Sequence, residues 1–209
     1  MPNWCSNYLQ IETKTPKQFT KLIQGITNDS EQPFDFNRII PTPEELENVS
    51  APNKENPQEM IKKYGYADWY DFRCARWGTK WNASDVDLTL ESPTSLSISF
   101  NTAWSPPIPV IEAIAEKYPF ASISLEYYEE GMGFAGLVEY ERGELVSESE
   151  QETNCEWRIE KWGECYEGCE NCGKCDCDKC DCESQTQQTI CKSCNEGNHN
   201  ENTKEEVTE

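Results

Sequence analysis

Apolar and polar residues alternate strictly in two neighbouring segments near the middle of the chain. Apolar side chains occupy every second position of residues 85–91 and again of residues 95–102. A period of two places successive side chains on opposite faces of a β-strand. The link between the two segments, Ser92-Pro93-Thr94, is rich in residues that favour turns. The pattern therefore predicts a β-hairpin with one apolar face.

Similar patterns predict that four more segments are strands. They are residues 4–12, 121–129, 134–141 and 144–150. The last two segments flank Arg142-Gly143, and glycine favours the tight turn of a hairpin. The predicted strands all lie within the first 150 residues of the chain.

Two other segments follow the helical period of 3.6 residues. Over residues 16–26 the apolar side chains recur three or four positions apart. Just before these apolar residues, Thr15 is suited to cap the helix and Pro16 is suited to its first position. Residues 107–118 show the same spacing, and their prolines are confined to the first turn. We therefore expect two amphipathic helices that pack on the sheet.

The order of these elements predicts the fold class. A strand, a helix, an insert, two strands, a helix and a strand form the split βαβ, or ferredoxin-like, arrangement of the α+β class. A further C-terminal hairpin follows. We expect this domain to span residues 1–150 and to contain an insert at about residues 41–82. Short helices are predicted inside the insert near residues 43–46 and 57–64.

One face of the predicted sheet carries an unusual set of side chains. If Cys5 and Leu9 face the helices, then Trp4 and Tyr8 point the other way, beside small polar residues of the strand at 95–102. A solvated face usually carries Lys, Glu and Thr, and a second core layer carries Val and Leu. We therefore expect this open face to meet another part of the chain or a ligand.

The insert and its surroundings are rich in tryptophan, beside the one place where the chain is locally basic. In one interpretation the tryptophans cap the sheet and the charges pair among themselves. In the other, the segment forms a concave site whose aromatic walls hold an anionic group. The candidate ligand-binding residues are Trp4, Tyr8, Trp69, Asp71, Arg73, Arg76, Trp77, Lys80, Trp81 and Trp104.

Several uncommon motifs lie in and around these segments. They are Met1-Pro2-Asn3-Trp4-Cys5-Ser6-Asn7, Asp68-Trp69-Tyr70-Asp71, Trp77-Gly78-Thr79-Lys80-Trp81, Thr102-Ala103-Trp104-Ser105-Pro106-Pro107, Glu129-Glu130-Gly131 and Phe134-Ala135-Gly136. Through these motifs, about residues 1–140 resemble the YubB-type ferredoxin-like domain family, whose members are encoded largely by phages and plasmids. The resemblance implies the fold and an origin in a mobile element, and it implies no assigned reaction or catalytic residues.

Nine of the 12 cysteines lie between Cys165 and Cys194, in a segment with almost no aliphatic residues. Pairs of Cys-x2-Cys on either side of a loop are typical of a structural four-cysteine zinc site. The spacing Cys172-x2-Cys175-x15-Cys191-x2-Cys194 fits this pattern, so we expect the tail at residues 151–194 to hold structural zinc, and competing pairs leave open whether it holds one ion or two. The alternatives are a metallothionein-like thiolate store, indicated by the Cys-x-Cys steps, and a disordered segment without metal. We expect residues 195–209 to form a disordered acidic end. The candidate zinc ligands are Cys169, Cys172, Cys175, Cys177, Cys180, Cys191 and Cys194.

Charge narrows the classes of function. The 209 residues include 39 acidic and 18 basic side chains, which gives a net charge of −21. Counting Asp and Glu against Lys and Arg divides this charge into −12 for residues 1–150 and −9 for the rest. Because phosphate backbones are bound through Lys and Arg, nucleic acid is disfavoured as a partner. The sequence also has a single histidine and no nucleophile elbow, phosphate-binding loop or zinc-protease motif, so we predict no catalytic residues.

No segment has the length and apolar character of a signal peptide or of a membrane span of about 20 residues. We therefore expect a cytoplasmic protein, and a reducing cytosol favours metal binding over disulfides for clustered cysteines. The combined prediction is a mobile-element accessory protein that binds a host protein or a small anionic ligand and interferes with a host defence or nucleic-acid system. The alternative is a small enzyme, or a nucleotide- or RNA-binding protein, that uses the aromatic cleft.

Overall fold

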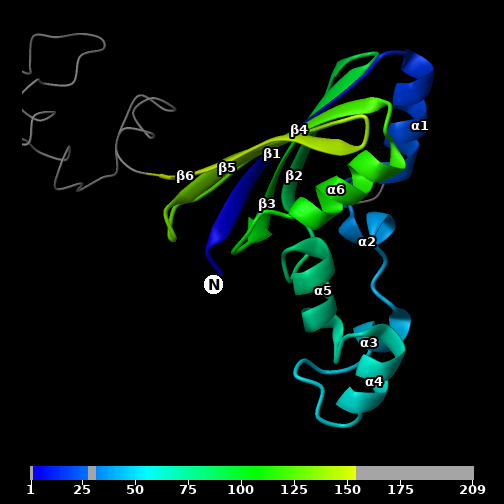
Figure 1. The fold of residues 1–209 in the computed structure, drawn as a ribbon, viewed down its shortest axis with the longest axis vertical. Coiled ribbons are helices and arrows are strands. Elements are labelled where there is room, and N and C mark those ends of the chain that lie inside the picture. The colour runs from blue at the N-terminus through cyan, green and yellow to red at the C-terminus, as the bar shows by residue number, and fades with distance from the viewer. Residues whose placement is uncertain (1, 28–31, 154–209) are drawn as a thin grey trace, which may run out of the picture. The chain divides into compact units, whose positions relative to one another are not determined.

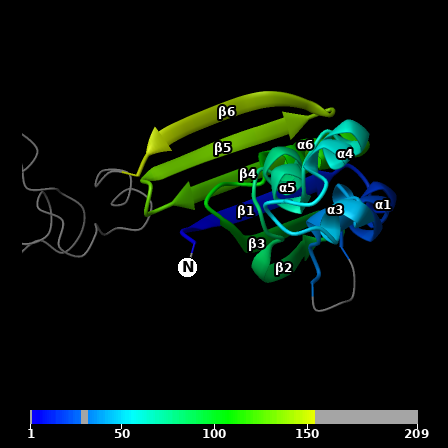
Figure 2. The ribbon, with the colours of Figure 1, turned by 90° about the horizontal axis from the view of Figure 1, so that it is seen from below.

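Six strands form one antiparallel sheet in the order β2-β3-β1-β4-β5-β6. Figure 2 shows the strands side by side in this order. The computed structural model describes residues 2–27 and 32–153, which belong to one compact unit that ends at Thr153. The predicted strands are confirmed, with β1 at Trp4–Thr13, β2 at Ser84–Ser92, β3 at Ser95–Ala103, β4 at Ala121–Glu129, β5 at Phe134–Glu141 and β6 at Glu144–Glu152.

Two helices cover one face of the sheet, as the helical spacing predicted (Figure 1). Helix α1 spans Pro16–Ile26, and helix α6 spans Ile108–Lys117. The hydroxyl of Thr15 accepts a hydrogen bond from the backbone N–H of Gln18, which satisfies one of the unpaired donors at the start of α1. The proline at the first position of α1 has no N–H that would need a partner.

The core of the ferredoxin-like arrangement is the four-strand order β2-β3-β1-β4 with α1 and α6 on one face. The predicted α+β, ferredoxin-like fold is therefore confirmed. Strands β5 and β6 extend the sheet beyond β4 as the predicted hairpin.

The main hydrophobic core lies between the sheet and these helices. Leu9 on β1 pairs with Ile98 on β3 and with Leu125 on β4, and all three side chains are fully buried. Leu22 of α1 and Ile111 of α6 belong to the same buried cluster. Complete burial of a side chain of this size stabilises the folded state by about 1.5–3 kcal/mol, so this layer dominates the stability of the domain.

Four short helices lie between α1 and β2. They are α2 at Phe36–Ile39, α3 at Glu44–Glu47, α4 at Pro57–Tyr64 and α5 at Trp69–Trp77. The two short helices predicted in the insert correspond to α3 and α4, whereas α2 and α5 were not predicted. Leu46, Met60 and Phe72 form a small second core that holds α3, α4 and α5 together.

The sequence suggested that the insert covers the open face of the sheet. In the structure the insert packs instead on the helix side. Trp77 at the end of α5 is buried to 1% exposure and packs on Phe36, with ring centroids 5.8 Å apart, within the core on the helix side. Figure 1 accordingly shows α5 beside the helix layer and below the sheet. The insert contacts one residue of the open face through Trp81, whose ring centroid lies 6.2 Å from that of Trp4 on β1.

In the described part of the chain, no helix has both the length and the apolar character needed to cross a membrane. The cysteine segment that was predicted to bind zinc, and the acidic end that follows it, lie outside the described residues.

Candidate functional site

A cavity of about 500 Å³ lies between the loop before α4, the start of α5 and the segment that follows α5. This volume falls within the range of about 300–1,000 Å³ that is usual for small-molecule sites. Four of the predicted binding residues, Trp69, Asp71, Lys80 and Trp81, line it together. The other lining residues are Ala51, Pro52, Asn53, Ala67, Asp68 and Tyr70.

Asp68 forms the polar floor of the cavity and is only 3% exposed. One carboxylate oxygen accepts hydrogen bonds from the backbone N–H groups of Tyr70 and Asp71, at 3.0 and 3.1 Å. The other oxygen accepts a bond of 3.0 Å from the backbone N–H of Asn53. Because this carboxylate caps the start of α5 and holds the opposing loop, the helix terminus is already neutralised from within the protein.

Asn53 fixes the loop on the other side of the cavity. Its side-chain amide donates hydrogen bonds to the carbonyl of Ala67 at 2.9 Å and to the side chain of Asn56 at 3.1 Å. Its side-chain oxygen accepts bonds from the backbone N–H groups of Glu55 and Asn56. The loop before α4 is therefore bound to the residues just before α5, and the floor is held in shape without a ligand.

The walls of the cavity are aromatic. The rings of Trp69 and Tyr70 meet edge to face, with centroids 5.9 Å apart and an interplanar angle of 79°. The ammonium group of Lys80 lies 4.0 Å from the centroid of the Trp81 ring, which is a cation–π contact. Trp81 is 39% exposed and Trp4, its neighbour across the margin of the cavity, is 41% exposed. A partner at this margin would therefore meet large aromatic surfaces that still face solvent.

A thiol lies beside this site on the next turn of α5. Burial raises the pKa of Cys74, although a hydrogen bond with Tyr70 and the charge of Lys80 both act to lower it. The neighbouring thiol in turn raises the pKa of Tyr70. Both groups are therefore protonated at neutral pH, and Cys74 lacks the lowered pKa of an activated nucleophile.

Arg73 and Trp77, which were also predicted binding residues, do not line this cavity. The guanidinium group of Arg73 pairs with Glu47 and donates a hydrogen bond of 3.3 Å to Thr42. It also lies 5.2 Å from the centroid of the Trp69 ring and 4.6 Å from that of Trp77. Arg73 therefore connects the back of the Trp69 wall to α3 and to the core, and its charge is offset by Glu47.

The three remaining predicted residues lie at other places on the surface. Tyr8 is 39% exposed and lies on the open face of β1. Trp104 follows β3 and donates its backbone N–H to the carbonyl of Asn3. Arg76 is exposed in the last turn of α5. The structure therefore brings four predicted residues into one cavity, places Trp4 at its margin and leaves the other five outside.

Sequence reasoning missed three residues that shape the site: Asn53, Pro52 and Asp68. Asp68 had a detectable signal, because an aspartate just before an aromatic segment is a common helix N-cap. Asn53 and Pro52 had none, since their role depends on the loop meeting α5, which follows it along the chain.

Comparisons with known proteins place this geometry in a family context. A family model described as the ferredoxin-like domain in Api92-like protein matches residues 76–204, which is more than half of the chain. The match includes Lys80 and Trp81 but begins after the loop and the α5 residues that complete the cavity. The crystal structure of protein api92 from Yersinia pseudotuberculosis is 12% identical and covers 74% of this chain and 99% of its own, with a TM-score of 0.44. No curated protein matches this chain.

Proposed function

We propose that this chain, which belongs to the family of Api92-like proteins with a ferredoxin-like domain, is an accessory binding protein of a mobile genetic element. The single observation that carries the binding role is the aromatic cavity, with Trp69, Tyr70 and Trp81 as walls and Lys80 at its edge. The YubB-type resemblance of the tryptophan motifs supports the origin in a phage or plasmid. On this proposal the bound component belongs to the host, and its capture interferes with a host defence or nucleic-acid system.

The chemistry of the cavity defines what it would hold. Both oxygens of Asp68 already accept backbone hydrogen bonds, so the floor has no strong polar group left for a ligand. Asp71 and Lys80 are the two lining residues whose charged groups are not used in this way. The best match is a flat, largely apolar group that stacks on the aromatic walls and carries an anionic or acceptor substituent for Lys80.

The same features support binding more than catalysis. A catalytic site needs a group that is poised to gain or lose a proton or to attack a substrate. Cys74, the nucleophilic side chain beside the cavity, has a raised pKa, and the polar floor at Asp68 and Asn53 serves the fold. We therefore propose recognition without a chemical step.

A nucleotide is the second candidate ligand, because stacking on Trp81 with a phosphate beside Lys80 would use both features of this edge. Stacking of a base on an aromatic side chain contributes about 1–3 kcal/mol and tolerates any base. A single nucleotide brings far less negative charge than a nucleic-acid strand, so the net charge of the chain opposes it less.

The proposal also includes structural zinc in the cysteine-rich segment and a cytoplasmic location. The zinc rests on the spacing of the Cys-x2-Cys pairs between Cys169 and Cys194. The location rests on the sequence, in which no segment has the length and apolar character of a signal peptide or a membrane span. Thiolate ligands in a closed four-cysteine shell leave no open position for water, so the metal would order the segment and would not act as a catalyst.

Binding to the cavity is tested with the full chain and three variants. The change in tryptophan fluorescence is titrated with the four nucleoside monophosphates, and host lysate is passed over the immobilised protein. Trp81→Leu and Lys80→Gln should each lower the affinity for the bound component roughly tenfold. The first removes the aromatic ring on which the ligand stacks, and the second removes the cation that meets its anionic group. Lys117→Gln is the matched control, because Lys117 also lies beside an aromatic ring, that of Tyr118, on α6.

Two results would contradict the proposal. One is that both cavity variants retain the binding of the wild-type chain. The other is that the control Lys117→Gln weakens binding as much as Lys80→Gln does, which would assign the effect to net charge alone. A nucleotide that binds with the expected Trp81 dependence would support the second candidate ligand.

A further inference from the structure

The sheet has an unusual charge composition. Every strand except β5 contains Ser, Thr, Asn or Gln residues, and every strand except β3 contains Asp or Glu, but none of the six contains Lys or Arg. Sheets that face water on one side normally mix both signs of charge. The open face of this sheet therefore receives carboxylates from its own strands and no cation.

The pairing register places these carboxylates in rows across the sheet. Glu12 on β1 pairs with Ser122 on β4, which pairs with Glu141 on β5. In the next row, Gln10 pairs with Ser124, which pairs with Glu139. Adjacent strands lie about 4.8 Å apart, so a row sets the acidic groups of β1 and β5 about 10 Å apart with a serine between them.

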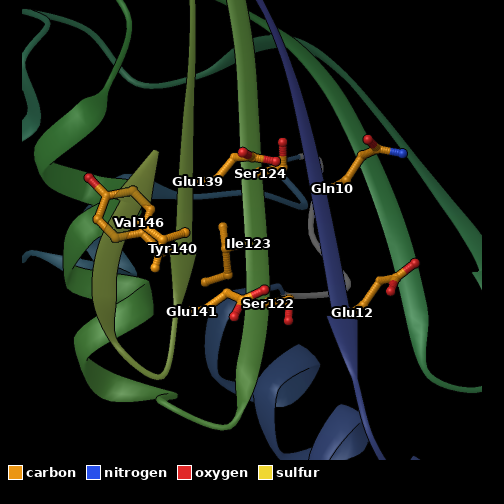
Figure 3. Close-up of a pocket in the computed structure, with 9 residues that line it drawn as sticks. All are labelled: Gln10, Glu12, Ser122, Ile123, Ser124, Glu139, Tyr140, Glu141 and Val146. Carbon is orange, nitrogen blue, oxygen red and sulfur yellow. The ribbon is translucent and has the colours of Figure 1, made fainter. Parts of the chain in front are cut away.

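The small serine side chains leave a hollow between the two acidic borders. It has a volume of about 230 Å³, and its lining includes Gln10, Glu12, Ser122, Ser124, Glu139 and Glu141. Figure 3 shows these side chains on three neighbouring strands, with the serines of β4 between the longer residues of β1 and β5. We call this hollow and its borders the acidic channel.

The acidic surface continues beyond the channel. Asp87 on β2 pairs with Ser99, which pairs with Tyr8, and both Asp87 and Tyr8 are exposed. The ion pairs found in the described residues, Lys63–Glu45 and Arg73–Glu47, both lie in the insert and do not neutralise this face. The electrostatic potential along the channel is therefore negative. The exposed ring of Tyr8 lies beyond one end of the channel.

We propose that the acidic channel docks an extended, Lys- or Arg-bearing segment of a partner protein. In an extended chain, alternate side chains lie on one side and repeat at about 7 Å, which is also the spacing of Glu139 and Glu141 along β5. A segment that lies along the channel would set successive cations between the borders of β1 and β5. An arginine at the far end would meet the exposed ring of Tyr8.

Charge selects this occupant over two others. Nucleic acid would bring phosphates to a face without cations, which removes the main source of its affinity for proteins. A second copy of this chain would bring a net charge of −21 to an acidic face, and like charge opposes such association. A basic segment gains both long-range attraction and contacts with the border carboxylates.

The inference is tested with the full chain and a synthetic peptide of five Lys-Ser repeats, with five Glu-Ser repeats as the peptide control. Affinity is measured by calorimetry at 50 mM and 200 mM salt. The face variant combines Glu12→Gln, Glu139→Gln and Glu141→Gln. The matched control combines Glu55→Gln, Glu112→Gln and Glu116→Gln, which remove the same charge from exposed positions elsewhere.

The face variant should bind the Lys-Ser peptide about tenfold more weakly than the wild-type chain, while the control variant should lose less than about twofold. Wild-type affinity should also fall between the two salt concentrations. In wild-type protein, the peptide should shift the amide signals of Ser122 and Ser124, a readout that does not depend on the folding of any variant. Lys80→Gln should leave this affinity unchanged, which separates the channel from the cavity.

Three results would overturn the inference. The first is an equal loss in the face and control variants, which would mean attraction by net charge without a site. The second is no binding of the Lys-Ser peptide to the wild-type chain at 50 mM salt. The third is self-association of the chain in sedimentation that the face variant abolishes, because the occupant would then be a second copy.

Discussion

Replacement of Asp68 by alanine should destabilise the insert and disorder the segments that line the cavity. The carboxylate of Asp68 binds the start of α5 through one oxygen and the loop before α4 through the other. Its loss removes a helix cap and leaves the backbone N–H of Asn53, a buried residue, without its acceptor. The variant therefore tests whether the cavity is held by the protein itself.

The magnitude follows from these contacts. Loss of an N-cap costs about 0.5–2 kcal/mol. A buried N–H that loses its partner costs about 1–3 kcal/mol more. The sum is about 1.5–5 kcal/mol of unfolding free energy, which is large against the usual stability of a domain. Asp71→Ala is the matched control, because Asp71 lies in the same first turn but is exposed and does not accept the hydrogen bonds that Asp68 accepts. Its loss should therefore cost at most about 1 kcal/mol.

Urea unfolding followed by circular dichroism measures both variants, and amide hydrogen exchange reports on the site itself. In Asp68→Ala the amides of Asn53, Tyr70 and Asp71 should lose protection, while those of Leu9 and Ile98 in the main core should keep it. The reasoning is refuted if Asp68→Ala and Asp71→Ala unfold at the same urea concentration, or if exchange at the three amides does not change.

Three further predictions concern the tail and the core. Elemental analysis of protein purified without chelator should find at least one zinc per chain. Cys172→Ser should lower the zinc content without changing the melting temperature of the domain. Thiols that titrate freely in protein without metal would reject the zinc site. A chain that ends at Thr153 should unfold cooperatively on heating, because all strands and helices of the described unit precede this residue, and a molten fragment would show that the tail belongs to the core. Burial raises the pKa of Cys5 from 9.0 to about 12 and that of Tyr140 from 10.0 to about 12. The unfolded chain therefore releases these protons at lower pH than the folded chain, so the stability of the fold should be complete below pH 9 and fall as pH rises from 9 to 12. In Cys5→Ala the fall between pH 9 and 10 should be smaller. A urea midpoint that stays constant over this range would contradict the assignment.

Strands β1 to β5 and the two main helices could be predicted because each has one apolar side, whereas β6 was predicted from the Arg142-Gly143 turn that joins it to β5. Each main helix, at residues 16–26 and 107–118, buries one apolar stripe against the sheet, and the alternating strands bury one face. The local spacing of apolar residues is therefore enough to predict these elements. Helix α5 could not be predicted in this way. Phe72 packs in the small core of the insert, whereas Trp77 packs in the main core. A helix that serves two cores shows no single apolar stripe.

The candidate site was predictable in its residue types but not in its members. Trp69, Asp71, Lys80 and Trp81 were all in the predicted set and meet in the cavity. Arg73 was counted as a free positive charge, yet it pairs with Glu47, which lies 26 positions earlier in the chain. A sequence shows how many charges a segment has, whereas the partner of each charge depends on which segments fold against it.

The amino-acid sequence by itself determined which side chains share a face, because the periods of strands and helices are properties of the local backbone. Only the tertiary structure decided which faces meet. The cavity joins Pro52, Asp68 and Trp81, and the acidic channel joins Glu12 with Glu139 and Glu141, across separations that no local pattern spans. The physical reason is that these groupings depend on strand register and on the packing of the insert. A shift of one residue in either strand pairing would move the same carboxylates to the opposite face of the sheet.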